Sequence, residues 1–176
     1  IGNKWIMIPR LSKKNYANPS RFYFFAGLME QPVKQFRGNI PVLPTARREL
    51  TEETGIPQNQ IEIVGPGLKK TSSKKARALV SVHSAESKSP GQDLIWLGRA
   101  KTKDPKGFLK RFFVQRSDGE WVPKKAKDQW EIGGGQLVEQ SSQALHEFLE
   151  THKHEIASVA LVALKALEME LKKNGR

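Results

Sequence analysis

The chain has 176 residues, with 30 lysines and arginines against 18 aspartates and glutamates, and it contains no cysteine. This length fits one domain with a core of its own, and the lack of cysteine excludes disulfides, thiolate nucleophiles and cysteine-based zinc sites. The formal charge of +12 favours polyanionic partners, namely nucleic acid or nucleotide polyphosphates.

The whole chain, residues 1–176, is expected to form a single domain. Because position 1 is Ile and not Met, we expect N-terminal residues of a longer precursor to precede it. The longest apolar run, residues 156–166, is interrupted by Ser158 and Lys165 and is too short to span a bilayer. No membrane partner is therefore expected, and the lack of cysteine fits an intracellular location, in the cytoplasm or in an organelle matrix.

The first third of the chain predicts two strands, a loop and a helix. Residues 4–9 and 21–25 are rich in β-branched and aromatic side chains, as strands are. Residues 32–44 contain Pro, Gly and Asn without a period and predict an extended loop. A helix is expected from Pro44 to about Thr54, with Gly55 as its left-handed C-cap.

The rest of the chain predicts several strands followed by C-terminal helices. Asp118 and Gly119 favour a tight hairpin turn, and the glycine run 133–135 is interpreted as a turn. Apolar residues recur at helical spacing after it, in two pieces broken near Lys153. The expected fold class is α/β or α+β, with a mixed sheet between helices. The expected strands cover residues 60–64, 78–82, 94–97, 108–115 and 120–122.

Three carboxylates lie close together on the first predicted helix. Glu49, Glu52 and Glu53 occupy positions i, i+3 and i+4, which places them on one face. Such side chains repel one another unless a cation neutralises them, and oxygen ligands suit Mg²⁺ or Mn²⁺. A glutamate-rich helix is also typical of a plain solvated face. The cluster opposes the positive charge of the whole chain, and this favours a site.

Residues 48–56, Arg-Glu-Leu-Thr-Glu-Glu-Thr-Gly-Ile, resemble the second half of the Nudix box. That half reads Arg-Glu-aliphatic-any-Glu-Glu-any-Gly-aliphatic, and every specified position is met. The resemblance implies a Nudix-like α/β/α sandwich in which the box helix carries Mg²⁺ or Mn²⁺. It implies hydrolysis of a pyrophosphate in a nucleoside diphosphate derivative, either a nucleotide or an RNA 5′ end.

The resemblance also assigns roles to individual residues. Glu52 and Glu53 are the expected principal metal ligands and catalytic residues, and Glu49 completes the ligand set. Arg48 locks the helix by pairing with a carboxylate, and Gly55 ends it. The expected base from outside the box is Glu120 or Glu139, and the expected substrate contacts are Gly27, Lys69 and Lys70.

The first half of the box departs from the pattern, and this leaves a second function open. The interval from Gly27 to Arg48 is longer than the pattern requires, and the first box glutamate would fall on Val33. The alternative is a catalytically impaired Nudix-like module that binds RNA or belongs to a large nucleoprotein complex. A third possibility is a nucleotide sensor without turnover.

Three further features of the sequence bear on its function. Basic segments at residues 69–77, 101–111 and 124–127 would provide an electrostatic surface for RNA or for phosphates of a large assembly. His146 and His152 are interpreted as solvated residues on a helix. Residues 130–151 faintly echo a second box, although their plainer interpretation is a turn before an amphipathic helix.

Overall fold

Strands β1 and β8 form the longest ladder of the computed structural model. They pair antiparallel from Trp5 opposite Glu139 to Leu11 opposite Ile132, with a register shift after Arg10. The structure describes residues 1–15, 18–25, 42–70, 78–84, 91–95, 97–127 and 131–175. Its elements are β1 (Trp5–Leu11), α1 (Val42–Thr54), η2 (Gln58–Gln60), β2 (Ile61–Val64), η3 (Pro66–Leu68), β3 (Val80–Ser84), β4 (Gly91–Ile95), β5 (Leu97–Ala100), α2 (Pro105–Phe112), β6 (Phe113–Gln115), β7 (Trp121–Pro123), β8 (Ile132–Glu139), α3 (Ser142–His152) and α4 (Ser158–Lys173).

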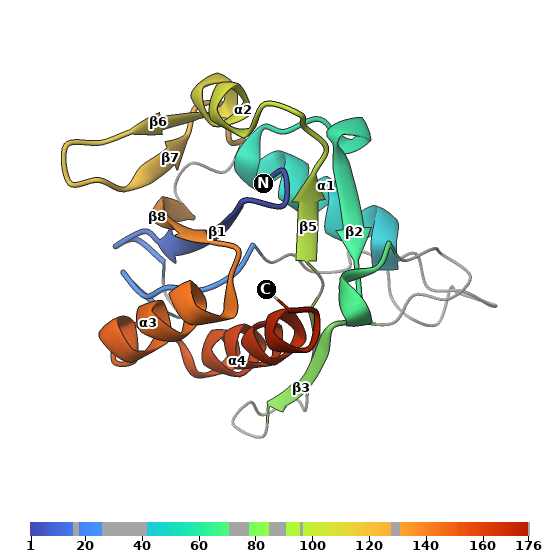
Figure 1. Ribbon diagram of the computed structural model, residues 1–176. Helices are drawn as coiled ribbons and strands as arrows, with labels where there is room; N and C mark the ends of the chain where they lie inside the picture. Colours follow the sequence, from blue (N-terminus) through green and yellow to red (C-terminus); the bar gives the residue numbers. More distant parts are fainter. Residues whose placement is uncertain are drawn as a thin grey trace, which may run out of the picture.

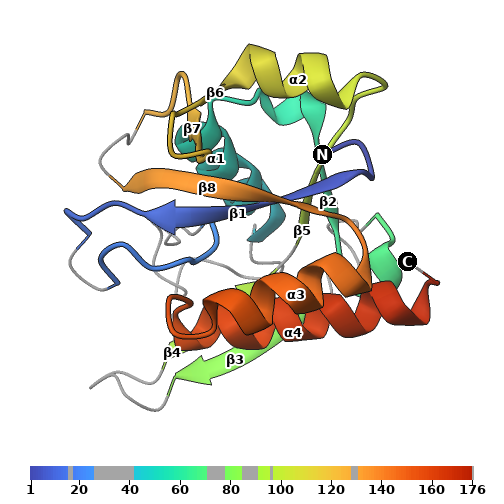
Figure 2. The same ribbon diagram turned by 60° about the vertical axis from the view of Figure 1, so that its left-hand side comes forward.

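Successive side chains of β1 serve two different cores, because a strand points them alternately to its two faces. Ile6 and Ile8 are buried in the cluster that includes Leu145 and Leu149 of α3. Trp5 and Met7 pack against the other cluster, which includes residues of α1, β2 and α2. Figure 2 accordingly shows β1 and β8 between α1 and α2 on one side and α3 and α4 on the other.

All four described ladders are antiparallel and have two strands each. They join β1 with β8, β2 with β5, β3 with β4 and β6 with β7 (Figure 1 and Figure 2). The expected mixture of helices and strands is confirmed, whereas these small antiparallel sheets stand in place of the one mixed sheet that was expected. No bilayer-spanning helix occurs in the described ranges, since none combines the necessary length and apolar character.

The helix boundaries near the glutamates and at the C-terminus agree with the prediction. Helix α1 ends at Thr54, and Gly55 has a φ of +70°. The break between α3 and α4 follows His152, with Lys153 as the C-cap of α3. The predicted loop at residues 32–44 lies outside the described residues up to position 41.

The predicted strand at residues 108–115 is wrong over most of its length, because a helix occupies residues 105–112. The Asp104 side chain caps this helix by accepting a hydrogen bond from the Gly107 N–H at 3.0 Å. Pro105 occupies its first turn, where a missing N–H costs nothing. Phe108 and Phe112, one turn apart, are both buried.

Two other local predictions are also wrong. Phe22 forms only isolated bridges, to Arg10 and to Ile156, so residues 21–25 are not a strand. The glycine run 133–135 lies inside β8 and is not a turn. The lack of side chains on these glycines lets β1 and β8 approach closely, since a Cβ on Gly135 would lie 2.8 Å from the Ile8 carbonyl oxygen.

Candidate functional site

The C-terminal end of α1 is held by a glycine that no other residue can replace without strain. Gly55 adopts a φ of +70°, and its N–H donates to the Thr51 carbonyl at 2.8 Å. A Cβ at this position would lie 2.8 Å from the carbonyl oxygen of Lys125. The segment that follows β7 therefore packs directly against the end of the glutamate-bearing helix.

The three glutamates of α1 have different surroundings. Glu49 accepts a hydrogen bond from Arg48, and the same guanidinium donates to Glu52 at 2.9 Å. Glu53 is only 4 % exposed. Arg48 thus pairs with two carboxylates of its own helix, as the sequence predicted for a residue that locks it.

Lys127 attaches to Glu52 at two points, which the sequence did not predict. Its backbone N–H donates to the Glu52 carbonyl at 2.6 Å, and its Nζ donates to Glu52 Oε1 at 3.1 Å. The hydrogen bond from Lys127 is the largest cause of a lowered pKa for Glu52, and the charges of Lys127 and Arg48 act in the same direction against a desolvation effect. From the sequence, the basic segment 124–127 is expected to contact RNA or the phosphates of a large assembly, not Glu52.

The described carboxylates of α1 are not gathered around one point in this arrangement. Across the described ranges, no three acidic or histidine side chains are placed so that they could share one metal ion. Glu52 is engaged by two cations, and Glu53 is buried. The donor atoms are of the type that Mg²⁺ or Mn²⁺ prefers, and the sharing of such an ion by the three glutamates stays a prediction.

Glu120, the expected base, lies in an ion-pair network around Arg10. The Arg10 Nε donates to Glu120 Oε1 at 2.7 Å, and Nη1 donates to Glu155 Oε2 at 2.8 Å. The Glu120 carboxylate occupies the space that a Cβ on Gly134 would need. These contacts join β1, the β6–β7 hairpin, β8 and the link between α3 and α4, and those described do not involve the glutamates of α1. Glu139, the other candidate, is exposed at the end of β8.

His152 belongs to the same network, so its interpretation as a solvated residue is wrong. Its side chain is 18 % exposed and lies against the rings of Phe22 and Phe148, with centroids 5.1 and 4.8 Å away. Its Nδ1 lies 2.9 Å from Glu155 Oε1. His146 is exposed, as expected, and lies 3.1 Å from Glu168.

The expected substrate contacts Lys69 and Lys70 lie beside the C-terminal helix. Both are exposed and directly follow η3. The backbone of η3 is fixed to α4, because the Gly67 N–H donates to Glu170 Oε2 at 2.7 Å. Their described neighbours are thus β2 and α4, not Glu52. Gly27, the third expected contact, lies outside the described residues.

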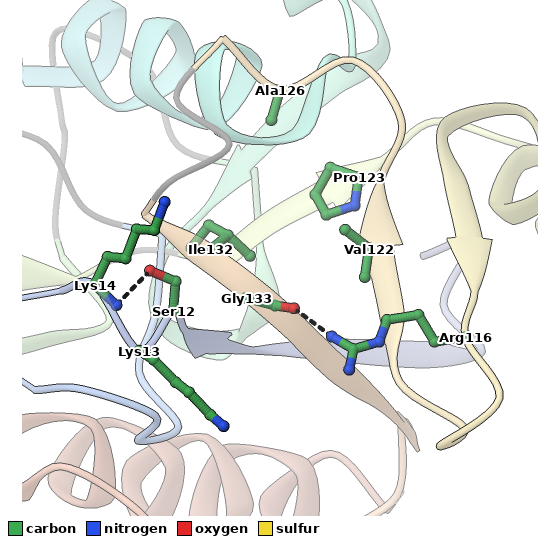
Figure 3. A pocket seen from close by; sticks show the side chains of 9 residues that line it. All are labelled: Ser12, Lys13, Lys14, Arg116, Val122, Pro123, Ala126, Ile132 and Gly133. Carbon is green, nitrogen blue, oxygen red and sulfur yellow. Dashed lines mark hydrogen bonds between the residues drawn. The ribbon is translucent and has the colours of Figure 1, made fainter.

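A hollow of about 450 Å³ lies near the C-terminal end of α1, at a place where the sequence predicted no site. Figure 3 shows its three cationic side chains, with Lys13 and Lys14 on one side and Arg116 on the other. Its wall includes Ala126, the residue before Lys127, so the hollow adjoins the attachment to Glu52. The lining residues are Ser12, Lys13, Lys14, Arg116, Val122, Pro123, Ala126, Ile132 and Gly133.

Three distant segments supply this lining, which explains why the sequence did not reveal it. Lys13 and Lys14 follow β1, Arg116 lies in the β6–β7 hairpin and Ile132 begins β8. Arg116 is held across the hollow's edge, because its Nη1 donates to the Gly133 carbonyl at 3.1 Å. Among the described residues, the lining of the hollow combines apolar and cationic side chains and includes no acidic one.

Comparison with protein-family models, with curated proteins and with solved structures gave no match for this chain. The resemblance to the Nudix box therefore depends on residues 48–56 themselves and on their setting in α1.

Proposed function

We propose that the chain is a Nudix-type hydrolase that cleaves the pyrophosphate of a nucleoside diphosphate derivative, either a nucleotide or an RNA 5′ end. The observation that carries this proposal is the agreement between residues 48–56 and their local structure. Arg48 pairs with two glutamates on the helix, Gly55 ends it in the left-handed region, and Ile56 is buried in the core. Arg48, Gly55 and Ile56 thus each have a structural reason for their positions.

The layered arrangement of the molecule supports the same proposal. Helices cover both sides of the β1–β8 ladder (Figure 2), as a Nudix-like sandwich requires. Alternate residues of β1 belong to the two cores, which supports one domain over residues 1–176. An intracellular location, in the cytoplasm or an organelle matrix, forms part of the proposal because the substrates named are found there.

The chain's own cations would bind the phosphates of such a substrate. Lys13, Lys14 and Arg116 surround the hollow, and Lys127 lies between it and Glu52. Charge-assisted hydrogen bonds from these groups would offset the negative charge of a polyphosphate. Mg²⁺ or Mn²⁺ is proposed as the cofactor because of the resemblance to the Nudix box. Binding of such an ion by the glutamates is measured separately from phosphate binding by the lysines and Arg116.

The test is hydrolysis of a panel containing nucleoside diphosphate derivatives, ADP-ribose and capped RNA, with Mg²⁺ or Mn²⁺ present. We expect Glu52→Gln and Glu53→Gln to reduce the rate by about 100-fold or more, the scale for loss of a catalytic carboxylate. Glu150→Gln, on the exposed side of α3, removes one charge elsewhere and should leave the rate unchanged. If the purified protein hydrolyses none of these substrates, the enzyme proposal is wrong.

A second candidate is a Nudix-like module that binds RNA or nucleotides without hydrolysis. It is favoured by the attachment of Lys127 and Arg48 to Glu52, which engages this carboxylate with cations of the chain itself. Phosphate-ligand binding that persists in EDTA and in the Glu52→Gln, Glu53→Gln double variant would support the module. Tight Mn²⁺ binding that is lost in the double variant would support the hydrolase.

A further inference from the structure

The cations around the hollow continue onto a neighbouring surface. The residue after Pro123, which lines the hollow, is Lys124, and its Nζ donates to the Lys110 carbonyl of α2 at 2.5 Å. Its backbone N–H donates to the Phe112 carbonyl at 2.8 Å. The wall of the hollow and the end of α2 are therefore parts of one surface.

We call this surface the basic face. Its members are all exposed lysines or arginines, and they come from four segments: the residues after β1, helix α2, the β6–β7 hairpin and the residues after β7. They are Lys13, Lys14 and Arg116 at the hollow, Lys106 and Lys110 on α2, and Lys124, Lys125 and Lys127 after β7.

Three of the described carboxylates beside the basic face are engaged in contacts of their own. Asp118 pairs with Arg116 at 2.6 Å, and Asp104 caps the first turn of α2. Glu52 accepts its hydrogen bond from Lys127. The lysines of the hollow and of α2 thus produce a positive field that these carboxylates reduce only locally.

We propose that the basic face binds single-stranded nucleic acid, with one nucleotide unit seated in the hollow and the adjoining phosphates on the lysines of α2 and residues 124–127. This inference deepens the proposed function, since it names the kind of phosphate ligand and the surface that receives it.

The size and chemistry of the hollow select this ligand. A volume of about 450 Å³ lies in the range of small-molecule pockets; it holds one nucleotide unit but not a duplex. The apolar residues of the described lining are Val122, Pro123, Ala126 and Ile132, and none of them is aromatic. Binding should therefore depend on the phosphate backbone and tolerate any base sequence.

An acidic protein partner fits the basic face less well. Lysine is depleted at protein–protein interfaces, where aromatic residues supply most of the energy. Among the described large hydrophobic residues, Val114 is the exposed one on the β6–β7 hairpin, since Val162 and Met169 lie on α4. Phosphate contacts, by contrast, commonly use lysine.

The experiment measures binding of labelled single-stranded RNA and of DNA with the same base order, in EDTA, at several salt concentrations. A double variant that carries Lys13→Gln and Lys14→Gln is compared with a second double variant that carries Lys165→Gln and Lys172→Gln. Both remove two exposed charges, but Lys165 and Lys172 lie on α4, on the other side of the β1–β8 ladder from α2 (Figure 2). The two variants thus have the same net charge and differ in its position.

We expect Lys13→Gln, Lys14→Gln to weaken binding by about tenfold and to lower the slope of log K against log salt by roughly 1.4, which is two contacts at about 0.7 each. The α4 variant should keep the wild-type slope. Equal losses in both variants would overturn the proposal, as would tighter binding of a duplex or equal binding of poly-glutamate. Tighter binding of RNA than of DNA, or equal binding of the two, supports the proposal. The comparison also shows whether the basic face distinguishes RNA from DNA.

The outcome is distinguishable from that of the hydrolysis test. Because EDTA prevents metal-dependent hydrolysis, strand binding is measured without turnover. If the wild-type protein hydrolyses nucleotides but does not bind single strands, the basic face is rejected and the hydrolase remains. Strand binding without hydrolysis of any substrate would reject the hydrolase and leave the basic face.

Discussion

Lys127 and Glu52 are joined by a backbone hydrogen bond of 2.6 Å and by an ion pair of 3.1 Å between Nζ and Oε1. The two residues are far apart in sequence, and this double attachment fixes the segment after β7 on the last turn of α1. It also places a cation of the chain on a carboxylate that the sequence assigns to a metal.

Substitution of this lysine should change the titration of its partner. Lys127→Met removes the hydrogen bond that is the largest cause of the lowered pKa of Glu52, so the pKa should rise toward its ordinary value. Arg48 remains and should keep part of the shift. Carboxyl NMR titration measures the pKa directly. Lys125→Met, at an exposed neighbour, is the control, and an equal rise there would show that the pair does not hold Glu52.

Gly55→Ala should destabilise the fold more than Gly119→Ala. Both glycines have positive φ, which costs another residue about 1 kcal/mol. The added methyl at position 55 also meets the Lys125 carbonyl, whereas position 119 is open. We expect losses in unfolding free energy of about 3 and about 1 kcal/mol, respectively, on the scale for overpacking plus backbone strain. Urea denaturation measures both, and equal losses would contradict the contact.

Arg10→Met should destabilise the protein by removing a cation shared by two carboxylates. The Arg10 side chain is 20 % exposed, donates to Glu120, Glu155 and the Ser20 carbonyl, and lies 3.8 Å from the centroid of the Phe22 ring. The expected loss is about 2 kcal/mol, typical of hydrogen bonds to charged groups. Arg21→Met, at an exposed position, should change stability by less than about 0.5 kcal/mol. A similar loss at both positions would argue against a special role for Arg10.

The stability of the protein should fall in acid partly through Glu155. The hydrogen bond from His152, followed by that from Arg10, lowers the pKa of Glu155 from its ordinary value of 4.5. A lowered carboxyl pKa adds stability above the ordinary value, and this contribution disappears as the pH falls through the folded-state pKa. Glu155→Gln should therefore reduce the loss of stability between about pH 5 and pH 3, which urea unfolding at each pH would reveal. If this variant loses as much stability in acid as the wild type, Glu155 does not contribute to the loss. Glu150→Gln removes one carboxylate elsewhere and serves as the control.

Local features of the chain were predictable because local physics determines them. The position of Leu50 on the predicted helix indicates which side of α1 packs. The preference of glycine for positive φ at Gly55 indicates where α1 ends. The helix at residues 105–112 has an equally local signal in Asp104 and Pro105. The aromatic residues that follow them favour a strand, and the prediction of a strand at residues 108–115 depended on this second signal. That error was one of competing signals.

The contacts that assemble the candidate site were not predictable from one sequence. The attachment of Lys127 to Glu52 and the meeting of Lys13 with Arg116 at the hollow join residues distant along the chain. The glycines of β8 look like turn residues, and only the close approach of β1 explains them. Pattern and propensity carry no information on such long-range approaches, which depend on how the layers pack.

The pairing of β1 with β8 has a consequence for biosynthesis. Trp5 finds its ladder partner only when Glu139 has been made, so most of this sequence must leave the ribosome before the central ladder can close. Contacts between such remote segments slow folding, because a long loop must be closed before they form. Until then the apolar residues Ile6 and Ile8 remain uncovered, and a nascent chain of this protein is a natural client for chaperones.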